Sequence, residues 1–256
     1  MKRVIRWALN HISRSTLHRL AGFVTPLFSV VYWGRRRRCP LCGGGFRRFL
    51  PYGYVGQRSE ALCPRCLSLE RHRMIWLWIE RNTELLTTLP ELLHIAPEPS
   101  LRRHFRHAYR GTTRYITADL ESPLADMHFD VQSIPLGDSS VDVVICNHLF
   151  EHVEDDRLAM RELHRIMRSG GWGIMLVPED RSRAETFEDD SITDAEERTR
   201  IFGQYDHRRI YGRDYDQRLR DAGFEVERIA FEQSLSEAER DSFRVGGDDL
   251  VIVRKV

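Results

Sequence analysis

Four of the five cysteines fall in two matched pairs whose spacing is typical of a metal site. Cys39-Pro-Leu-Cys42 and Cys63-Pro-Arg-Cys66 share the form Cys-Pro-x-Cys, with twenty residues between them. Two thiolates in one tight turn can bind the same Zn²⁺, and two such turns fill all four tetrahedral positions. We therefore predict a structural zinc ribbon with Cys39, Cys42, Cys63 and Cys66 as ligands. Paired thiols used in this way indicate a reducing, cytoplasmic compartment.

A second group of polar side chains follows an apolar run from Val141 to Cys146, which predicts a strand buried on both faces. The group consists of Asn147, His148, Glu151 and His152. A segment of helical periodicity then runs to Gly170-Gly171, and Gly173–Val177 predicts another buried strand. In a strand-helix-strand unit of a parallel sheet, ligands bind beyond the carboxyl ends of the strands. The sequence therefore predicts a binding site at this polar group.

The motifs around this unit resemble those of class I S-adenosylmethionine-dependent methyltransferases of the small-molecule type. They are, in chain order, Asp130-Val131, Ile134-Pro135-Leu136, Asp138-Ser139, Val141-Asp142, Asn147-His148, Phe150-Glu151-His152 and Gly170-Gly171. The resemblance implies an α/β fold with a doubly wound, Rossmann-like, seven-stranded methyltransferase sheet, here preceded by a small N-terminal zinc ribbon. It also implies S-adenosylmethionine as the cofactor. The acceptor is not identified by these motifs.

Two carboxylates carry the predicted cofactor site. Tyr115–Ala118 predicts a strand, and Asp119 after it can accept hydrogen bonds from both hydroxyls of a ribose, although capping a turn is the commoner role. The resemblance implies that Asp130 receives the adenine amino group, with the Val131 amide near the ring. A nicotinamide dinucleotide is a competing ligand for Asp119, but the chain lacks G-x-G-x-x-G. The predicted cofactor-binding residues are Ala96, Glu98, Asp119, Leu120, Asp130, Val131 and Asn147.

The turn after the predicted first core strand, Leu92–Ala96, departs from the family pattern. It continues as Pro97-Glu98-Pro99-Ser100 and contains no glycine. Glycines in such a turn let the backbone approach the ligand, and proline offers no N–H group. Ala96 is small enough to replace a glycine in part. A noncatalytic binding module is therefore an alternative to an enzyme.

Methyl transfer requires alignment of donor and acceptor and a base where the acceptor carries a proton. We predict His148 or His207 as that base, because an ordinary imidazole pKa of about 6.5 suits neutral pH. Asn147 is predicted to contact the methionine moiety or the acceptor, with capping of the next helix as the alternative.

A polar insertion of about residues 179–215 predicts a cap over the acceptor, with a solvated loop of local salt bridges as the alternative. The predicted acceptor-binding residues are Glu151, His152, Thr186, Glu188, Arg198, Gln204, Asp206, Arg209 and Tyr211.

Charge is unevenly distributed along the 256 residues. Residues 1–59 contain twelve Lys and Arg and no Asp or Glu, a charge of +12, and the 27 basic and 38 acidic residues of the remainder give −11. This basic arm, residues 1–59, suits binding to an anionic membrane or to nucleic acid, and a solvated charged face is the alternative.

In residues 2–20 an imperfect amphipathic helix is expected, which predicts either peripheral contact of residues 1–38 with the inner face of a membrane or packing on the body. The apolar run Ala21–Trp33 is shorter than the roughly 20 residues of a membrane span, and no cleavage site follows, so neither a span nor cleavage is expected.

These features predict three segments. They are a basic, partly amphipathic segment 1–33, a zinc ribbon 34–72, and a methyltransferase domain 73–256. The predicted activity is methyl transfer to a small-molecule, glycan or lipid-linked acceptor. An RNA methyltransferase that uses the ribbon and the basic arm to hold phosphates is the first alternative.

Overall fold

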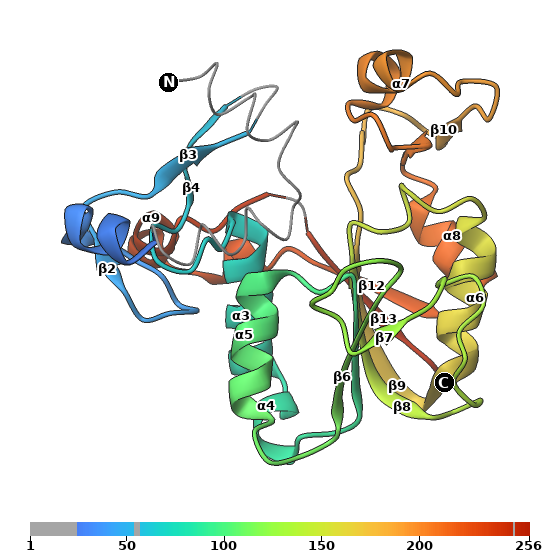
Figure 1. The fold of residues 1–256 in the computed structure, drawn as a ribbon, viewed down its shortest axis with the longest axis horizontal. Coiled ribbons are helices and arrows are strands. Elements are labelled where there is room, and N and C mark those ends of the chain that lie inside the picture. Colours follow the sequence, from blue (N-terminus) through green and yellow to red (C-terminus); the bar gives the residue numbers. More distant parts are fainter. Residues whose placement is uncertain (1–24, 54–56, 248) are drawn as a thin grey trace. The chain divides into compact units, whose positions relative to one another are not determined.

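The computed structural model describes residues 25–53, 57–247 and 249–256. They form two compact units (Figure 1), an N-terminal unit of residues up to Asn82 together with Glu232–Gly247, and a sheet unit of Thr83–Phe231 together with the C-terminal residues. The helix after the cysteines and a late segment of the chain belong to the N-terminal unit.

The sheet unit is built on seven strands, which confirms the predicted α/β fold. In spatial order they are β12 (Glu225–Ile229), β13 (Leu250–Arg254), β9 (Met167–Leu176), β8 (Val141–Asn147), β5 (Leu92–Ile95), β6 (Tyr115–Asp119) and β7 (Met127–His128). β5 to β9 pair in parallel, whereas β13 is antiparallel to both of its neighbours. This is a Rossmann-like sheet that ends in the antiparallel pair of β13 and β12.

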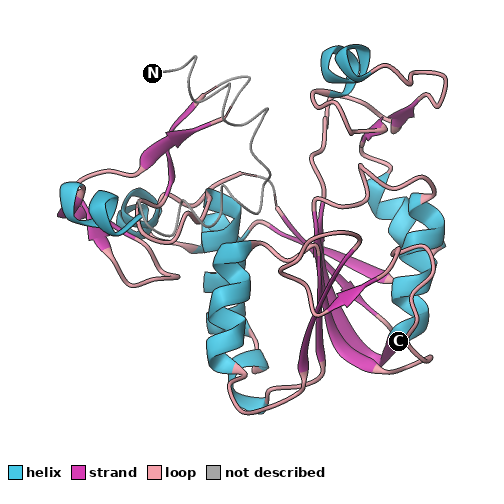
Figure 2. Ribbon diagram, viewed as in Figure 1, coloured by secondary structure: helices cyan, strands magenta, loops and turns pink. Residues whose placement is uncertain are grey.

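Helices cover both faces of this sheet (Figure 2). α5 (Pro99–Ala108) lies on one face, and α6 (Asp156–Ile166) and α8 (Tyr215–Asp221) lie on the other. Because both faces are covered, the central strands are buried throughout, and Val144, Ile145 and Cys146 of β8 are fully inaccessible. The remaining elements of the unit are α4 (Leu85–Thr88), β10 (Phe187–Glu188), α7 (Ala195–Phe202) and β11 (Arg209–Ile210).

The connection from α6 to β9 differs from the prediction of a helix that runs to Gly170-Gly171. The helix ends at Ile166, and Met167 already has the extended φ and ψ of −72° and 142°. Met167 pairs with Val141 of β8, and the register then shifts before Trp172 pairs with Val143. Gly170 takes a φ of +80° in this irregular stretch, so here glycine accommodates a distorted strand and not a helix end.

Among its described residues, the N-terminal unit contains two small hairpins, a helical segment over residues 25–31 and two further helices. The hairpins are β1 (Trp33–Arg38) with β2 (Gly45–Phe46), and β3 (Leu50–Tyr52) with β4 (Arg58–Leu62). The helices are α3 (Glu70–Asn82) and α9 (Glu237–Phe243), and the 3₁₀ helix η1 (Phe231–Ser234) precedes α9. The buried Arg37 of β1 forms ion pairs with Glu60 at 2.6 Å and with Asp241 at 2.7 Å. The pair with Asp241 ties α9 to β1, although 204 residues separate Arg37 from Asp241 in the chain.

The predicted amphipathic helix within residues 2–20 lies outside the described residues. Residues 25–31, inside the predicted apolar run, are helical. No helix in the described part of the chain combines the length and apolar character needed to cross a membrane.

Candidate functional site

The turn after β5 adopts the backbone conformation that its missing glycine would favour. Ala96 has a φ of +46°, in the left-handed region. Its N–H donates to the carbonyl of Ala118 in β6 over 2.8 Å, which fixes the start of the turn. Alanine, which has the smallest side chain with a Cβ, therefore occupies a position that costs any residue with a Cβ roughly 1–2 kcal/mol.

Glu98 links this turn to two neighbouring strands. Its Oε2 lies 2.8 Å from Nε2 of His94, and its Oε1 accepts a hydrogen bond of 3.3 Å from the Asn147 amide. His94 is completely buried in β5, and its Nδ1 lies 3.0 Å from the Tyr115 hydroxyl. Sequence reasoning missed His94, although one polar residue inside the apolar strand Leu-Leu-His-Ile was a usable signal.

Asp119 ends β6 and caps the turn that follows. Its Oδ1 accepts hydrogen bonds from the backbone N–H groups of Glu121 and Ser122, at 3.0 and 2.9 Å. Oδ2 takes no part in these two bonds, so one carboxylate oxygen can receive a ligand hydroxyl. The adjacent Leu120 is 63 % exposed, which presents an apolar side chain beside the carboxylate.

The loop that carries Asp130 and Val131 is held by hydrogen bonds from Arg165 of α6. Asp130 is exposed and accepts from the backbone N–H of Gln132 over 2.9 Å, whereas Val131 is buried. Further along the loop, Arg165 donates to the carbonyls of Ile134 and Leu136 at 2.9 and 2.8 Å. The two predicted carboxylates therefore lie on separately anchored loops at the carboxyl ends of β6 and β7.

His148 follows β8 in a strained conformation next to a buried acid. Its φ is +53°, and its N–H donates to the carbonyl of Leu176 over 2.6 Å. Nδ1 of His148 lies 3.3 Å from Oε1 of Glu151. Strain of this kind concentrates at functional sites, and the acid fixes the orientation of the imidazole.

His152 and His207 meet beside the same acid. Their ring centroids are 4.7 Å apart, and Glu151, His152 and His207 each offer a ligand atom within 4.8 Å of the others. Nδ1 of His152 lies 3.3 Å from the carbonyl of Asp206, and burial lowers the pKa of His207. Gln204 donates to Asp206 at 2.7 Å, so this part of the predicted acceptor group is brought together.

The other predicted acceptor residues have partners inside the protein. Arg209 is buried and donates to the carbonyls of Phe150, Val153 and Glu154 and to the carboxylate of Glu188. The buried hydroxyl of Tyr211 donates to Asp156 over 2.7 Å. Thr186 donates to Asp214, and Arg198 donates to the carbonyl of Ile192. These contacts hold the cap together, and acceptor binding by these residues stays a prediction.

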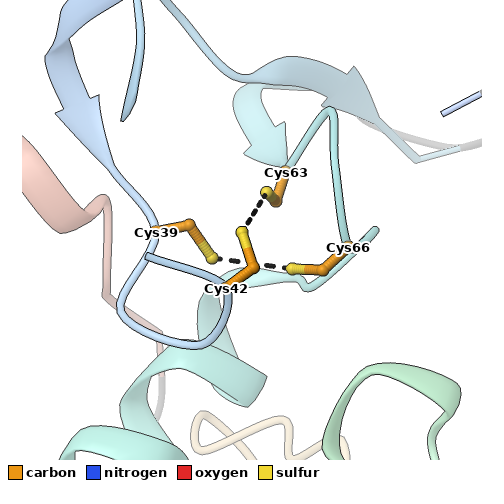
Figure 3. A group of neighbouring side chains, drawn as sticks. All are labelled: Cys39, Cys42, Cys63 and Cys66. Carbon is orange, nitrogen blue, oxygen red and sulfur yellow. Dashed lines mark hydrogen bonds between the residues drawn. The ribbon is translucent and has the colours of Figure 1, made fainter. Parts of the chain in front are cut away.

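The four predicted zinc ligands converge in the N-terminal unit (Figure 3), where their sulfurs all lie within 4.8 Å of one another. The Sγ atoms of Cys39 and Cys66 are 3.6 Å apart, and those of Cys42 and Cys63 are 3.8 Å apart. Both knuckles close with the same bond, from the N–H of Gly43 to Cys39 O and from that of Leu67 to Cys63 O. Leu67 accepts a φ of +57° to make this turn, so the second knuckle forms despite its lack of glycine.

Residues 81–175 match the family model described as a methyltransferase domain. Among solved structures, the YcgJ protein from Bacillus subtilis is 14 % identical, with 72 % of this chain and 98 % of that chain covered and a TM-score of 0.45. An S-adenosylmethionine-dependent methyltransferase from Mesorhizobium loti is 13 % identical, with coverages of 65 % and 91 % and a TM-score of 0.45. No curated protein matches the chain.

Proposed function

We propose that the chain is an S-adenosylmethionine-dependent methyltransferase. The observation that carries the proposal is the placement of the left-handed Ala96 turn and the Asp119 carboxylate at the ends of two adjacent parallel strands. The turn lets the backbone approach a ligand, and a free carboxylate oxygen suits a ribose hydroxyl. The match of residues 81–175 to methyltransferase domains supports the same cofactor.

The side chains around this edge suit the parts of the cofactor. Asp119 holds the ribose of the cofactor, and Leu120 packs against its purine. Asp130 and the Val131 amide bind the polar edge of the purine. Glu98 and Asn147 face the methionine end of the cofactor. The bound cofactor supplies an electrophilic methyl group, and His148, oriented by Glu151, takes the acceptor proton.

The acceptor that we propose is a small-molecule, glycan or lipid-linked group held under the cap of residues 179–215. Support comes from the cluster of Glu151, His152, Gln204, Asp206 and His207 beside His148. This cluster has the density of hydrogen-bonding groups that a polar acceptor requires.

We also propose that the cysteine cluster holds a structural Zn²⁺. Four thiolates at about 2.3 Å from one tetrahedral ion lie about 3.8 Å from each other, and two of the sulfur–sulfur distances are 3.6 and 3.8 Å. Four thiolates leave no open position, so the metal would stabilise the N-terminal unit and take no part in the reaction.

Calorimetry with S-adenosylhomocysteine tests the function. Asp119→Asn keeps the acceptor for the turn but removes the charge, so affinity should fall by about tenfold or more. Glu121→Gln, an exposed neighbour, should bind as the wild type does. Absence of binding by the wild-type chain would leave the noncatalytic alternative.

Exposed arginines favour RNA as a second candidate acceptor. Arg35, Arg36 and Arg38 project from β1, and Trp33 beside them is 70 % exposed. Cationic and aromatic side chains together suit phosphates and unstacked bases. RNA binding that weakens steeply with salt and is lost when the three arginines are replaced by Gln would support this candidate. Salt-independent binding would oppose it.

A further inference from the structure

We propose that Glu151, His152 and His207 form a binding site for a divalent transition-metal ion. The three residues come from two loops, one after β8 and one between α7 and β11, and each offers a ligand atom within 4.8 Å of the others. Movements on the order of 1 Å would bring these atoms to the roughly 3–3.5 Å that separates ligands of a shared ion.

The buried carboxylate of Glu151 has an oxygen that needs such a partner. Glu151 is 1 % exposed, and its Oε1 contacts His148. Its Oε2 has no hydrogen-bond partner among the described residues. A buried carboxylate oxygen without a partner is costly, and a cation in contact with Oε2 would remove that cost.

Both imidazoles are held as metal-binding histidines usually are. Nδ1 of His152 lies 3.3 Å from the carbonyl of Asp206, and Nδ1 of His207 lies 3.3 Å from the carbonyl of Phe202. A histidine that ligates a metal through one ring nitrogen typically donates from the other to a carbonyl or carboxylate. Both rings are therefore oriented with Nε2 left for an ion.

The loops that carry these ligands are joined by hydrogen bonds to backbone carbonyls. The N–H of Arg208 donates to the carbonyl of Glu151 over 2.8 Å. Next to it, Arg209 donates to the carbonyls of Val153 and Glu154 at 2.7 and 2.8 Å. The ligand set therefore does not depend on a mobile segment, and its position is set by the fold.

The donor set indicates the class of ion. Two imidazoles and one carboxylate suit Zn²⁺, Co²⁺, Ni²⁺ or Fe²⁺, and hard ions such as Mg²⁺ prefer oxygen ligands. Three protein ligands leave at least one position open for a solvent molecule or a ligand oxygen. Metal binding here requires no methyl transfer, so it goes beyond the proposed function.

A Co²⁺ titration of the untagged full-length chain, with Zn²⁺ already in the cysteine cluster, tests the site. One further equivalent should bind, with an absorption spectrum that lacks sulfur-to-metal charge-transfer bands. His152→Ala, His207→Ala and Glu151→Gln should each weaken this binding at least about tenfold, the effect that loss of even an outer-shell partner can have. His107→Ala, an exposed histidine on α5, should leave it unchanged.

Binding of no further equivalent by the wild-type chain would overturn the proposal. Spectra with sulfur bands would overturn it as well, because they would show exchange at the cysteines alone. Co²⁺ affinities of the three variants equal to that of the wild type would also overturn the proposal. Thermal unfolding checks that the variants fold. The titration contains no S-adenosylhomocysteine, so failure here is distinguishable from failure of the methyltransferase proposal.

Discussion

The side-chain amide of Asn147 donates to Glu98 over 3.3 Å and so joins the carboxyl ends of β8 and β5. Oδ1 of the same amide accepts from the backbone N–H of Leu176 in β9 over 3.3 Å. One buried side chain therefore links three adjacent strands at the edge where the cofactor is proposed to bind.

Replacement of Asn147 by Ala should lower stability and cofactor affinity together. The change leaves the buried N–H of Leu176 without its side-chain partner, which costs about 1–3 kcal/mol. Urea unfolding measures the first effect and calorimetry with S-adenosylhomocysteine the second. An unfolding free energy equal to that of the wild type would show that the amide is dispensable.

Ala96 sets the limit on what the first turn tolerates. Ala96→Gly should change stability little, because relief of the left-handed strain offsets the greater chain entropy of glycine. Ala96→Val should destabilise by more than about 1 kcal/mol, since a β-branched residue rarely takes a positive φ. Thermal unfolding of the two variants separates these effects. Equal melting temperatures would contradict the strain seen at this turn.

Arg165 is expected to act on cofactor binding from a distance. It contacts the loop of Asp130 through two carbonyls and forms an ion pair with Glu162 at 2.8 Å. Arg165→Ala should weaken S-adenosylhomocysteine binding severalfold, because the loop loses these anchors. Arg161→Ala removes an exposed arginine from the same helix and is the matched control. Equal affinity in both variants would exclude a positioning role.

Four core strands, β5, β6, β8 and β9, were predictable because each has a signal in the sequence. The apolar, β-branched run of β8 and the alternation that ends at Asp119 of β6 show the period of a buried strand. The end of α6 was not predictable, because Met167 fits the apolar period of the helix and also the register of the next strand. Tertiary pairing with Val141 decided between them.

The cysteine cluster was predictable from its spacing, whereas the side-chain contacts of the cap were not. The spacing of Cys39, Cys42, Cys63 and Cys66 was sufficient to expect a cluster. Nothing in the sequence shows that Arg209 turns its guanidinium inward to backbone carbonyls, because an arginine in a polar run fits an exposed position equally well. The approach of His207 to His152 is likewise a property of the tertiary fold.

Stability should depend on His164 as the pH falls below about 7. Burial, followed by the charge of Lys255, lowers the pKa of His164 below its ordinary value of 6.5. The unfolded chain therefore takes up this proton first, and stability falls as pH drops through 6.5 toward the folded pKa. The unfolding free energy of His164→Gln should fall less steeply with pH than that of the wild type. Parallel pH profiles would remove His164 as a cause.

Loss of Arg73 should affect the proposed zinc ribbon. Its fully buried guanidinium donates to the carbonyls of Ala61 and Ser68, which flank the second knuckle, and to those of Phe243 and Arg244 at the end of α9. Its charge also offsets the net negative charge that four thiolates leave on a zinc centre.

Arg73→Lys keeps the charge but has too few donors, in the wrong geometry, for these four carbonyls. The change should cost about 2–4 kcal/mol, because buried carbonyls lose their partners. Zinc should also pass faster to a chelator, as a colorimetric metal indicator records. Arg38→Lys, on an exposed position of β1, is the control. Unchanged zinc release with reduced stability would assign Arg73 to the packing of α9 alone, because the knuckle would then hold its metal without this side chain.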